Sequence, residues 1–329
     1  MRRRFGSQNG LRVLDEGRQV VHGLLPEYVF GPVDSRRYGK SLGVNPFPLG
    51  EKICSFNCPY CECGWTNKHW VGKHNEILWP SLVTLLDEIE SRLKKAREQG
   101  EQIDAITFAG NGEPTLYPEF GELIEGTLAL RKKWVPAARV IVLTNASELH
   151  RTDIREALLK VDETCMKLDA VSPEVVRAIN KPHSSLSMDS LISLMQAFPS
   201  PVIQTMFVHG PSDNTGEKEI ALWIAALIRI HPVRVDLYSI DRAAPDPRVS
   251  RVPAETLQAI ADRVRREVGV PVLFINSSYG QKKPVKGVGV TGRVLRGGFL
   301  RWVCGLRIRG IESEALRLST HKNELPGEE

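Results

Sequence analysis

Short apolar runs alternate with amphipathic helical segments from about residue 40 onward. Most runs are rich in Val and Ile and are bounded by Gly, Asn, Pro or Asp, which is typical of buried parallel strands. Between the runs, apolar residues recur at helical spacing, as from Leu82 to Leu93, after Pro80 and before Gly100. The pattern predicts strands over residues 41–44, 103–109, 139–144, 163–168, 202–208, 234–240 and 270–275.

Repeated strand–helix units predict parallel strands joined by right-handed crossovers. Six or seven such units form either an open doubly wound sheet or a complete or partial barrel, and the pattern does not decide between them. In both architectures ligands collect at the carboxyl ends of the strands. Unusual polar groups occur at these ends: the segment 110–114 (Gly-Asn-Gly-Glu-Pro), Thr144 with Asn145, and Asp169. These positions predict an active site.

The composition is that of a globular protein with a substantial core. Of its 329 residues, 42% are hydrophobic and 25% are charged, which excludes intrinsic disorder and a small disulfide scaffold. No window approaches the run of about 18 apolar residues that a membrane helix needs, and no targeting segment is visible at the N-terminus. We therefore expect a cytoplasmic protein, without a membrane partner, in a reducing compartment.

Four of the six cysteines fall within ten residues: Cys54, Cys58, Cys61 and Cys63. Crowded cysteines in a chain of this size bind metal more often than they form disulfides. The first three have the spacing C-x3-C-x2-C, which suits three irons of a cubane cluster and leaves the fourth iron open to a small molecule. A zinc site with Cys63 as fourth ligand is the alternative, although no second two-cysteine knuckle is present. Unliganded thiols are a third interpretation.

The cysteine loop, with Tyr60 before its third cysteine, resembles the signature of radical S-adenosylmethionine (SAM) enzymes. The segment 110–114 resembles their Gly-Gly-Glu-Pro segment, and Thr144-Asn145 resembles their Thr-Asn-Gly, with Ala146 in place of Gly. Residues 168–170 (Leu-Asp-Ala) end the fourth strand as in many members. The stretch 30–43 is similar to the subgroup related to wyosine-base-forming tRNA enzymes. Those enzymes carry second-cluster cysteines upstream, whereas this chain has no cysteine before Cys54.

The resemblance implies a partial (β/α)6-type TIM barrel of parallel strands with N- and C-terminal extensions. It implies a [4Fe–4S] cluster on Cys54, Cys58 and Cys61, and reductive cleavage of SAM to a 5′-deoxyadenosyl radical that acts on an unidentified substrate. An electron donor such as a flavodoxin or ferredoxin is then needed. The implied cofactor-binding residues are Tyr60, Gly110, Asn111, Gly112, Glu113, Asn145 and Lys167, with residues 235–239 along the adenine pocket.

Three further residues carry open alternatives. Lys167 is either a partner of the SAM carboxylate or the structural partner of Glu163 or Asp169. Cys165 shares a strand face with Lys167, so it is either a catalytic hydrogen donor to a substrate radical or a small buried hydrophobe. His183, in Asn-Lys-Pro-His, is either a substrate contact or a loop cap. Cys63 and Cys304 have no assigned role, and a second cluster on Cys63, Cys165 and Cys304 requires the fold to bring them together.

The C-terminal part of the chain is strongly basic. Residues 280–311 contain eight Lys and Arg residues and no Asp or Glu, and these charges exceed the net charge of +5, so the remainder is slightly acidic. We therefore divide the chain into an N-terminal extension (1–30), a radical SAM partial barrel (31–276), and a basic Gly-rich extension with a polar tail (277–329). Clustered cations grip phosphates, which keeps two alternatives open: a tRNA- or RNA-modifying radical SAM enzyme, and a non-catalytic, metal-stabilised nucleic-acid-binding protein. The segment can equally be a plain solvated surface.

Overall fold

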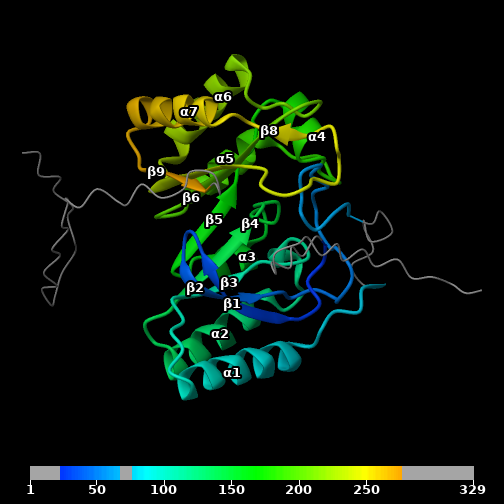
Figure 1. Ribbon diagram of the computed structural model, residues 1–329, viewed down its shortest axis with the longest axis vertical. Coiled ribbons are helices and arrows are strands. Elements are labelled where there is room, and N and C mark those ends of the chain that lie inside the picture. The colour runs from blue at the N-terminus through cyan, green and yellow to red at the C-terminus, as the bar shows by residue number, and fades with distance from the viewer. Residues whose placement is uncertain (1–22, 67–75, 276–329) are drawn as a thin grey trace, which may run out of the picture. The chain divides into compact units, whose positions relative to one another are not determined.

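The computed structural model describes residues 23–66 and 76–275, and a curled half-barrel sheet of mostly parallel strands dominates this part of the chain (Figure 1). An antiparallel hairpin, β1 (Val29–Ser35) and β2 (Gly39–Val44), forms one edge. Five further strands follow β2 in parallel: β3 (Ala105–Phe108), β4 (Arg139–Thr144), β5 (Glu163–Lys167), β6 (Val202–His209) and β7 (Arg234–Ser239). The parallel strand β9 (Val272–Ile275) closes the row, and the short β8 (Ser250–Arg251) pairs antiparallel with β6.

Helices supply the crossovers between the parallel strands. Their bounds are α1 (Leu82–Glu98), the 3-10 helix η3 (Pro114–Leu116), α2 (Phe120–Trp134), α3 (Thr152–Leu158), α4 (Pro173–Ile179), α5 (Met188–Gln196), α6 (Glu217–Ile230) and α7 (Ala254–Glu267). The Ser81 hydroxyl caps α1 by accepting from the Thr84 backbone N–H. The buried face of α1 carries Leu85, Ile89 and Leu93, as its sequence period predicts.

Alternate residues of each strand face the helices or the interior of the half-barrel. On β4, Val140 and Val142 join the main apolar core with the helices, whereas Leu143 lines the cavity on the other face. On β5, Met166 belongs to the core while Lys167 lines the cavity. This alternation follows from the period of two of a strand. It sends polar side chains into the half-barrel while Val and Ile cover its helical side.

An ionic network around the buried carboxylates Glu163 and Asp236 lies at the amino ends of β5 and β7. Glu163 accepts from the Tyr38 hydroxyl (2.8 Å), from Arg139 (2.7 Å) and from Arg234 (2.8 Å). Arg234 also binds Asp236 (2.6 Å). Tyr38 comes from the turn of the β1–β2 hairpin. Because its hydroxyl reaches Glu163 at the start of β5, the turn lies at the amino-terminal end of the half-barrel.

The described fold confirms the fold class, and each of the seven predicted strands has a counterpart. The sequence pattern did not show β1 as a strand, because only Val29 of its residues is buried. The predicted boundary at residues 30 and 31 falls inside β1. The basic segment and Cys304 lie outside the described residues, so their roles stay predictions.

Candidate active site

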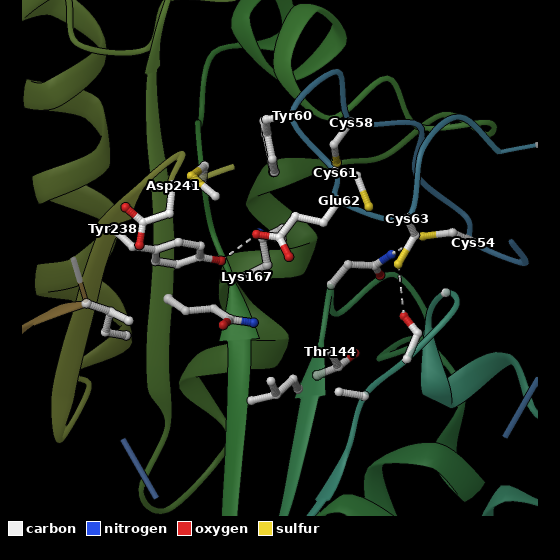
Figure 2. Close-up of a pocket in the computed structure, with 18 of the residues that line it drawn as sticks. Cys54, Cys58, Tyr60, Cys61, Glu62, Cys63, Thr144, Lys167, Tyr238 and Asp241 are labelled. Carbon is white, nitrogen blue, oxygen red and sulfur yellow. Dashed lines mark hydrogen bonds between the residues drawn. The ribbon is translucent and has the colours of Figure 1, made fainter. Parts of the chain in front are cut away.

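One cavity of about 570 Å³ opens at the carboxyl ends of the parallel strands. The Cys54–Cys63 loop forms one side of it, and Tyr238 and Asp241 lie on the opposite side (Figure 2). Lys167 and the strand ends of β3 and β4 line the wall between these sides. The expected site residues that line the cavity are Cys54, Cys58, Tyr60, Cys61, Gly110, Gly112, Glu113, Asn145 and Lys167.

The cysteine loop is held by hydrogen bonds from the surrounding strands. The Asn145 side chain donates to the Ser55 hydroxyl (2.8 Å) and toward the Cys54 sulfur (3.7 Å). The backbone N–H of Phe56 also points at the Cys54 sulfur (3.4 Å). The polar end of β4 therefore fixes the first cysteine, which gives Asn145 a structural role that its sequence position alone did not reveal.

A buried lysine lies among the thiols. Lys52 is only 4% exposed, and its ammonium donates to the carbonyl of Gly64 (2.7 Å). Burial alone would lower the pKa of Lys52, but the neighbouring thiols of Cys61, Cys54 and Cys58 outweigh it and raise that pKa. Burial raises the pKa of the Cys54 thiol to about 12, with Lys52 opposing the rise. The loop therefore combines soft sulfur donors with a fixed cation.

Cys63 lies beside the predicted ligands and lines the cavity. Its thiol donates to the carbonyl of Gly110 (3.3 Å). A hydrogen bond between Cys63 and Cys61 lowers the pKa of Cys61, with help from Lys52. These contacts connect Cys63 to the site, a connection that the ligand spacing did not show.

Backbone hydrogen bonds join the turn after β3 to the start of the cysteine loop. Ile53 donates its backbone N–H to Asn111 (2.9 Å) and accepts from the N–H of Glu113 (3.0 Å). A Cβ on Gly112 would lie 1.6 Å from the carbonyl oxygen of Ile53, so only glycine allows this approach. The side chain of Asn111 pairs with the backbone of Leu25 (2.7 and 3.0 Å), and Asn111 is not among the cavity-lining residues.

The carboxylate of Glu113 joins the ends of β3 and β4. It accepts from the backbone N–H of Asn145 (2.6 Å), the Thr144 hydroxyl (2.6 Å), and the hydroxyl and N–H of Thr115 (2.6 and 3.2 Å). The side chain is 2% exposed. All four partners are donors, so Glu113 holds the two strand ends in register below the cavity.

Lys167 occupies the middle of the cavity wall with its charge compensated. Its ammonium lies 3.5 Å from Asp169, donates to the Tyr238 hydroxyl (3.1 Å), and packs over the rings of Tyr60 (5.3 Å) and Tyr238 (5.5 Å). Burial would lower the pKa of Lys167, but Asp169 and Tyr238 raise it overall. The ion pair with Asp169 is the structural alternative that the sequence left open. A contact with SAM stays a prediction.

Asn180 connects the same network to the second cysteine. Its side-chain amide donates to Asp169 (2.7 Å) and Tyr60 (3.3 Å) and toward the Cys58 sulfur (3.6 Å). Its carbonyl accepts from the Asn57 N–H (2.9 Å). The backbone N–H of His183 also binds the loop, at the Ser55 carbonyl (3.0 Å). The Asn-Lys-Pro-His segment therefore holds the cysteine loop in place.

Cys165 is fully buried and is not among the cavity-lining residues. Its sulfur lies 3.7 Å from the Arg37 guanidinium and 4.0 Å from Asp236. Arg37 itself lines the cavity and donates to Gln204 (3.2 Å). Burial raises the pKa of the Cys165 thiol to about 12. Cys165 is therefore buried among polar side chains below the cavity lining, and both interpretations of it, the small buried residue and the hydrogen donor, stay predictions.

The donor set suits a group larger than one ion. Among residues 23–66 and 76–275, no three His, Cys, Asp or Glu side chains gather closely enough to hold a single metal ion. That criterion concerns ligands of one ion, whereas the thiolates of a cubane bind different irons. Cys54, Cys58 and Cys61 line one cavity, N–H donors point at two of their sulfurs, and the buried Lys52 lies beside them. These residues fit an anionic, thiolate-held cluster.

A comparison with known families identifies the chain. Residues 52–224 match the model of the radical SAM superfamily. The chain belongs to the radical SAM superfamily. Membership implies SAM and an iron–sulfur cluster as cofactors, and the matched range contains the cysteine loop, the turn after β3 and Lys167.

Sequence relatives place this radical SAM protein in a narrower family. It is 32% identical over 270 residues to UPF0026 protein slr1464 of Synechocystis sp., covering 74% of this chain and 94% of the relative. It is 37% identical over 169 residues to UPF0026 protein MJ1312 of Methanocaldococcus jannaschii, covering 51% and 49% of the two chains. The chain therefore also belongs to the UPF0026 family.

Solved structures share the fold of this radical SAM protein. A radical SAM methyltransferase from Sphaerobacter thermophilus superposes with a TM-score of 0.54 at 15% identity, over 72% of this chain and 66% of the other. TYW1 with a lysine–pyruvate adduct bound gives 0.52 at 16% identity, over 70% and 75%. These two superpositions show that the described residues share the fold of the two proteins. Within the described residues, no helix has both the length and the apolar character needed to cross a membrane.

Proposed function

We propose that this protein holds a [4Fe–4S] cluster on Cys54, Cys58 and Cys61 and uses it to cleave SAM reductively. When bound, the cluster supplies the single electron that breaks the sulfonium bond and releases methionine and a 5′-deoxyadenosyl radical. The observation that carries the proposal is the shared cavity, in which the three cysteines face the Gly110–Glu113 turn and Lys167. A non-catalytic metal module gives no role to that cavity.

The chain's own residues prepare this reaction. The Glu113 carboxylate joins the end of the Gly110–Glu113 turn to the end of β4. The backbone of this turn would bind the SAM amino group, and the Lys167 cation would bind its carboxylate. The aromatic side of the Cys54–Cys63 loop is fixed by Tyr60 bonded to Asp169. The ionic network around Glu163 fills the amino-terminal end of the half-barrel. A radical formed in the cavity is thereby shielded from solvent on that side.

Anaerobic reconstitution tests the proposal. The wild type should bind iron and sulfide in equal amounts and form 5′-deoxyadenosine from SAM and a low-potential reductant, without any added substrate. Cys58→Ala should lose both the cluster and the product. The matched variant Cys63→Ser should retain its iron, because Cys63 is not a ligand in this scheme. Zinc without sulfide, or loss of the metal in Cys63→Ser, would instead support the four-cysteine zinc site.

We further propose RNA as the substrate class and a flavodoxin or ferredoxin as the electron donor. The support for RNA is the basic segment 280–311, whose cations would bind phosphates. A triple variant in which Gln replaces Arg293, Arg296 and Arg301 should bind RNA more weakly, and its binding should depend less on salt concentration. Unchanged binding in a titration across salt concentrations would favour a small-molecule or peptide substrate.

A further inference from the structure

Lys52 closes the cysteine loop from the inside. It precedes Cys54 by two residues, and its ammonium reaches the carbonyl of Gly64, the residue after Cys63 (2.7 Å). The contact therefore links the start of the loop to its end. Its side chain is nine-tenths buried or more, since the residue is 4% exposed. The ammonium is thus fixed within the loop that carries all three proposed ligands.

The charge of Lys52 has no carboxylate partner in the described part of the chain. No Asp or Glu oxygen there lies within 4.0 Å of its ammonium, whose partners are the neutral carbonyl of Gly64 and the Cys61 thiol. Two half-buried cations of the cavity differ, since Lys167 lies 3.5 Å from Asp169 and Arg37 lies 3.5 Å from Asp236. A buried charge without a counter-charge is strongly unfavourable. Its compensation must come from the thiols beside it, as thiolates, and from the group that they bind.

We propose that Lys52 is the built-in counter-ion of the iron–sulfur cluster and that its charge sets how readily the cluster is reduced. This inference rests on the proposed function, because it needs a cluster on Cys54, Cys58 and Cys61. Each thiolate brings a negative charge, and the electron that enters the cluster adds another. A fixed cation beside the three thiols therefore stabilises the reduced cluster more than the oxidised one. Lys52 acts through the cluster, so it is a positioning and tuning residue.

The sign of the effect follows directly. Without the ammonium the reduced cluster loses stabilisation, so the midpoint potential must fall and reduction must become harder. We expect the ratio of reduced to oxidised cluster, at a fixed applied potential, to drop at least about tenfold. For one electron a tenfold change corresponds to about 59 mV. A shift of this size is readily resolved in a redox titration followed by electron paramagnetic resonance.

The test compares Lys52→Met, which keeps a long unbranched side chain but removes the charge, with Lys52→Arg, which keeps the charge. Lys160→Met is the matched control, because Lys160 lies on the surface and pairs with Glu125. The redox titration of the reconstituted full chain should show a lower midpoint for Lys52→Met alone. An unchanged midpoint in Lys52→Met overturns the inference. An equal drop in Lys52→Arg overturns it too, because the charge would then not be the cause.

Two further measurements separate this inference from folding and from the proposed function. As apoprotein, Lys52→Met should melt close to the wild type, because losing the bond to the Gly64 carbonyl is offset by removing a buried charge. If it folds yet loses its cluster while Lys52→Arg retains it, the counter-ion role is supported. Lower melting of the iron-free variant with loss of the cluster marks a structural residue and overturns it. A wild type that takes up no cluster defeats the proposed function itself, whereas normal SAM cleavage with an unshifted midpoint defeats only the role of Lys52.

Discussion

Replacing Glu113 should cost stability in two steps of different size. The oxygen Oε1 accepts three hydrogen bonds, from the Thr144 hydroxyl and from the hydroxyl and N–H of Thr115, whereas Oε2 accepts only the Asn145 N–H. Glu113→Gln can place its amide oxygen at Oε1 and keep three bonds. Its amide NH2 then faces the Asn145 N–H, so one bond is lost and two donors meet in a buried place. An unsatisfied buried donor costs about 1–3 kcal/mol, so we expect a loss of about 2 kcal/mol.

Glu113→Ala removes all four acceptor contacts, and at about 1 kcal/mol each the loss is about 4 kcal/mol. Urea unfolding of the cluster-free protein at 25 °C measures both values, with the exposed Glu156→Gln as control. Burial raises the pKa of Glu113. A Glu113→Gln variant as stable as the wild type would mean that burial outweighs the four hydrogen bonds and that the Glu113 carboxyl is protonated in the folded protein. That result would refute the four-donor account of this turn.

Two more perturbations test the network and the loop. Burial opposes ionisation of Glu163, but hydrogen bonds led by Arg234 outweigh it and lower its pKa. Glu163→Gln should therefore lower the free energy of unfolding by about 3 kcal/mol at pH 7. This loss relative to the wild type should shrink as the pH falls from about 4.3, the pKa of an unfolded Glu, toward the lower pKa of Glu163 in the folded protein, which unfolding curves at several pH values would show. A constant difference would contradict this. Asn180→Ala removes the N–H that points at Cys58 and should speed iron release to a chelator about tenfold; an unchanged rate would mean that Asn180 does not support the cluster.

The sequence predicted the sheet because most parallel strands are buried on their helical side and carry a run of Val and Ile. The strand over residues 139–144 illustrates this, since Val140 and Val142 enter the apolar core. β1 escaped prediction because all its residues except Val29 are half-buried or exposed and its sequence, VFGPVDS, interrupts the apolar run. β9 lies at the opposite edge and was predicted, because its sequence, VLFI, is apolar throughout.

The candidate site was predictable where a short motif carries the chemistry. The cysteine spacing and the glycine–glutamate turn located the cavity, since both occur within a few residues of the chain. Asn111 shows the limit, because a turn motif does not say which way each side chain points. Lys52 and Asn180 escaped for another reason: their contacts with the cysteine loop depend on how the loop folds back and on segments more than 100 residues apart.

The cations on the two sides of the cavity differ in how far their charges are compensated. Lys167 and Arg37, on the strand side, each lie near a buried aspartate, so their charges are partly compensated before any ligand binds. Lys52, on the cysteine side, faces thiols and a neutral carbonyl. Negative charge is therefore most strongly favoured at the cysteine end, where a thiolate-held cluster would bring it. The ion pair of Lys167 also makes its ammonium a poor nucleophile, because Asp169 stabilises the protonated form. In this chain Lys167 is thus suited to binding an anionic group by charge, and a neutral amine for covalent attachment of a carbonyl substrate would first require Asp169 to move away.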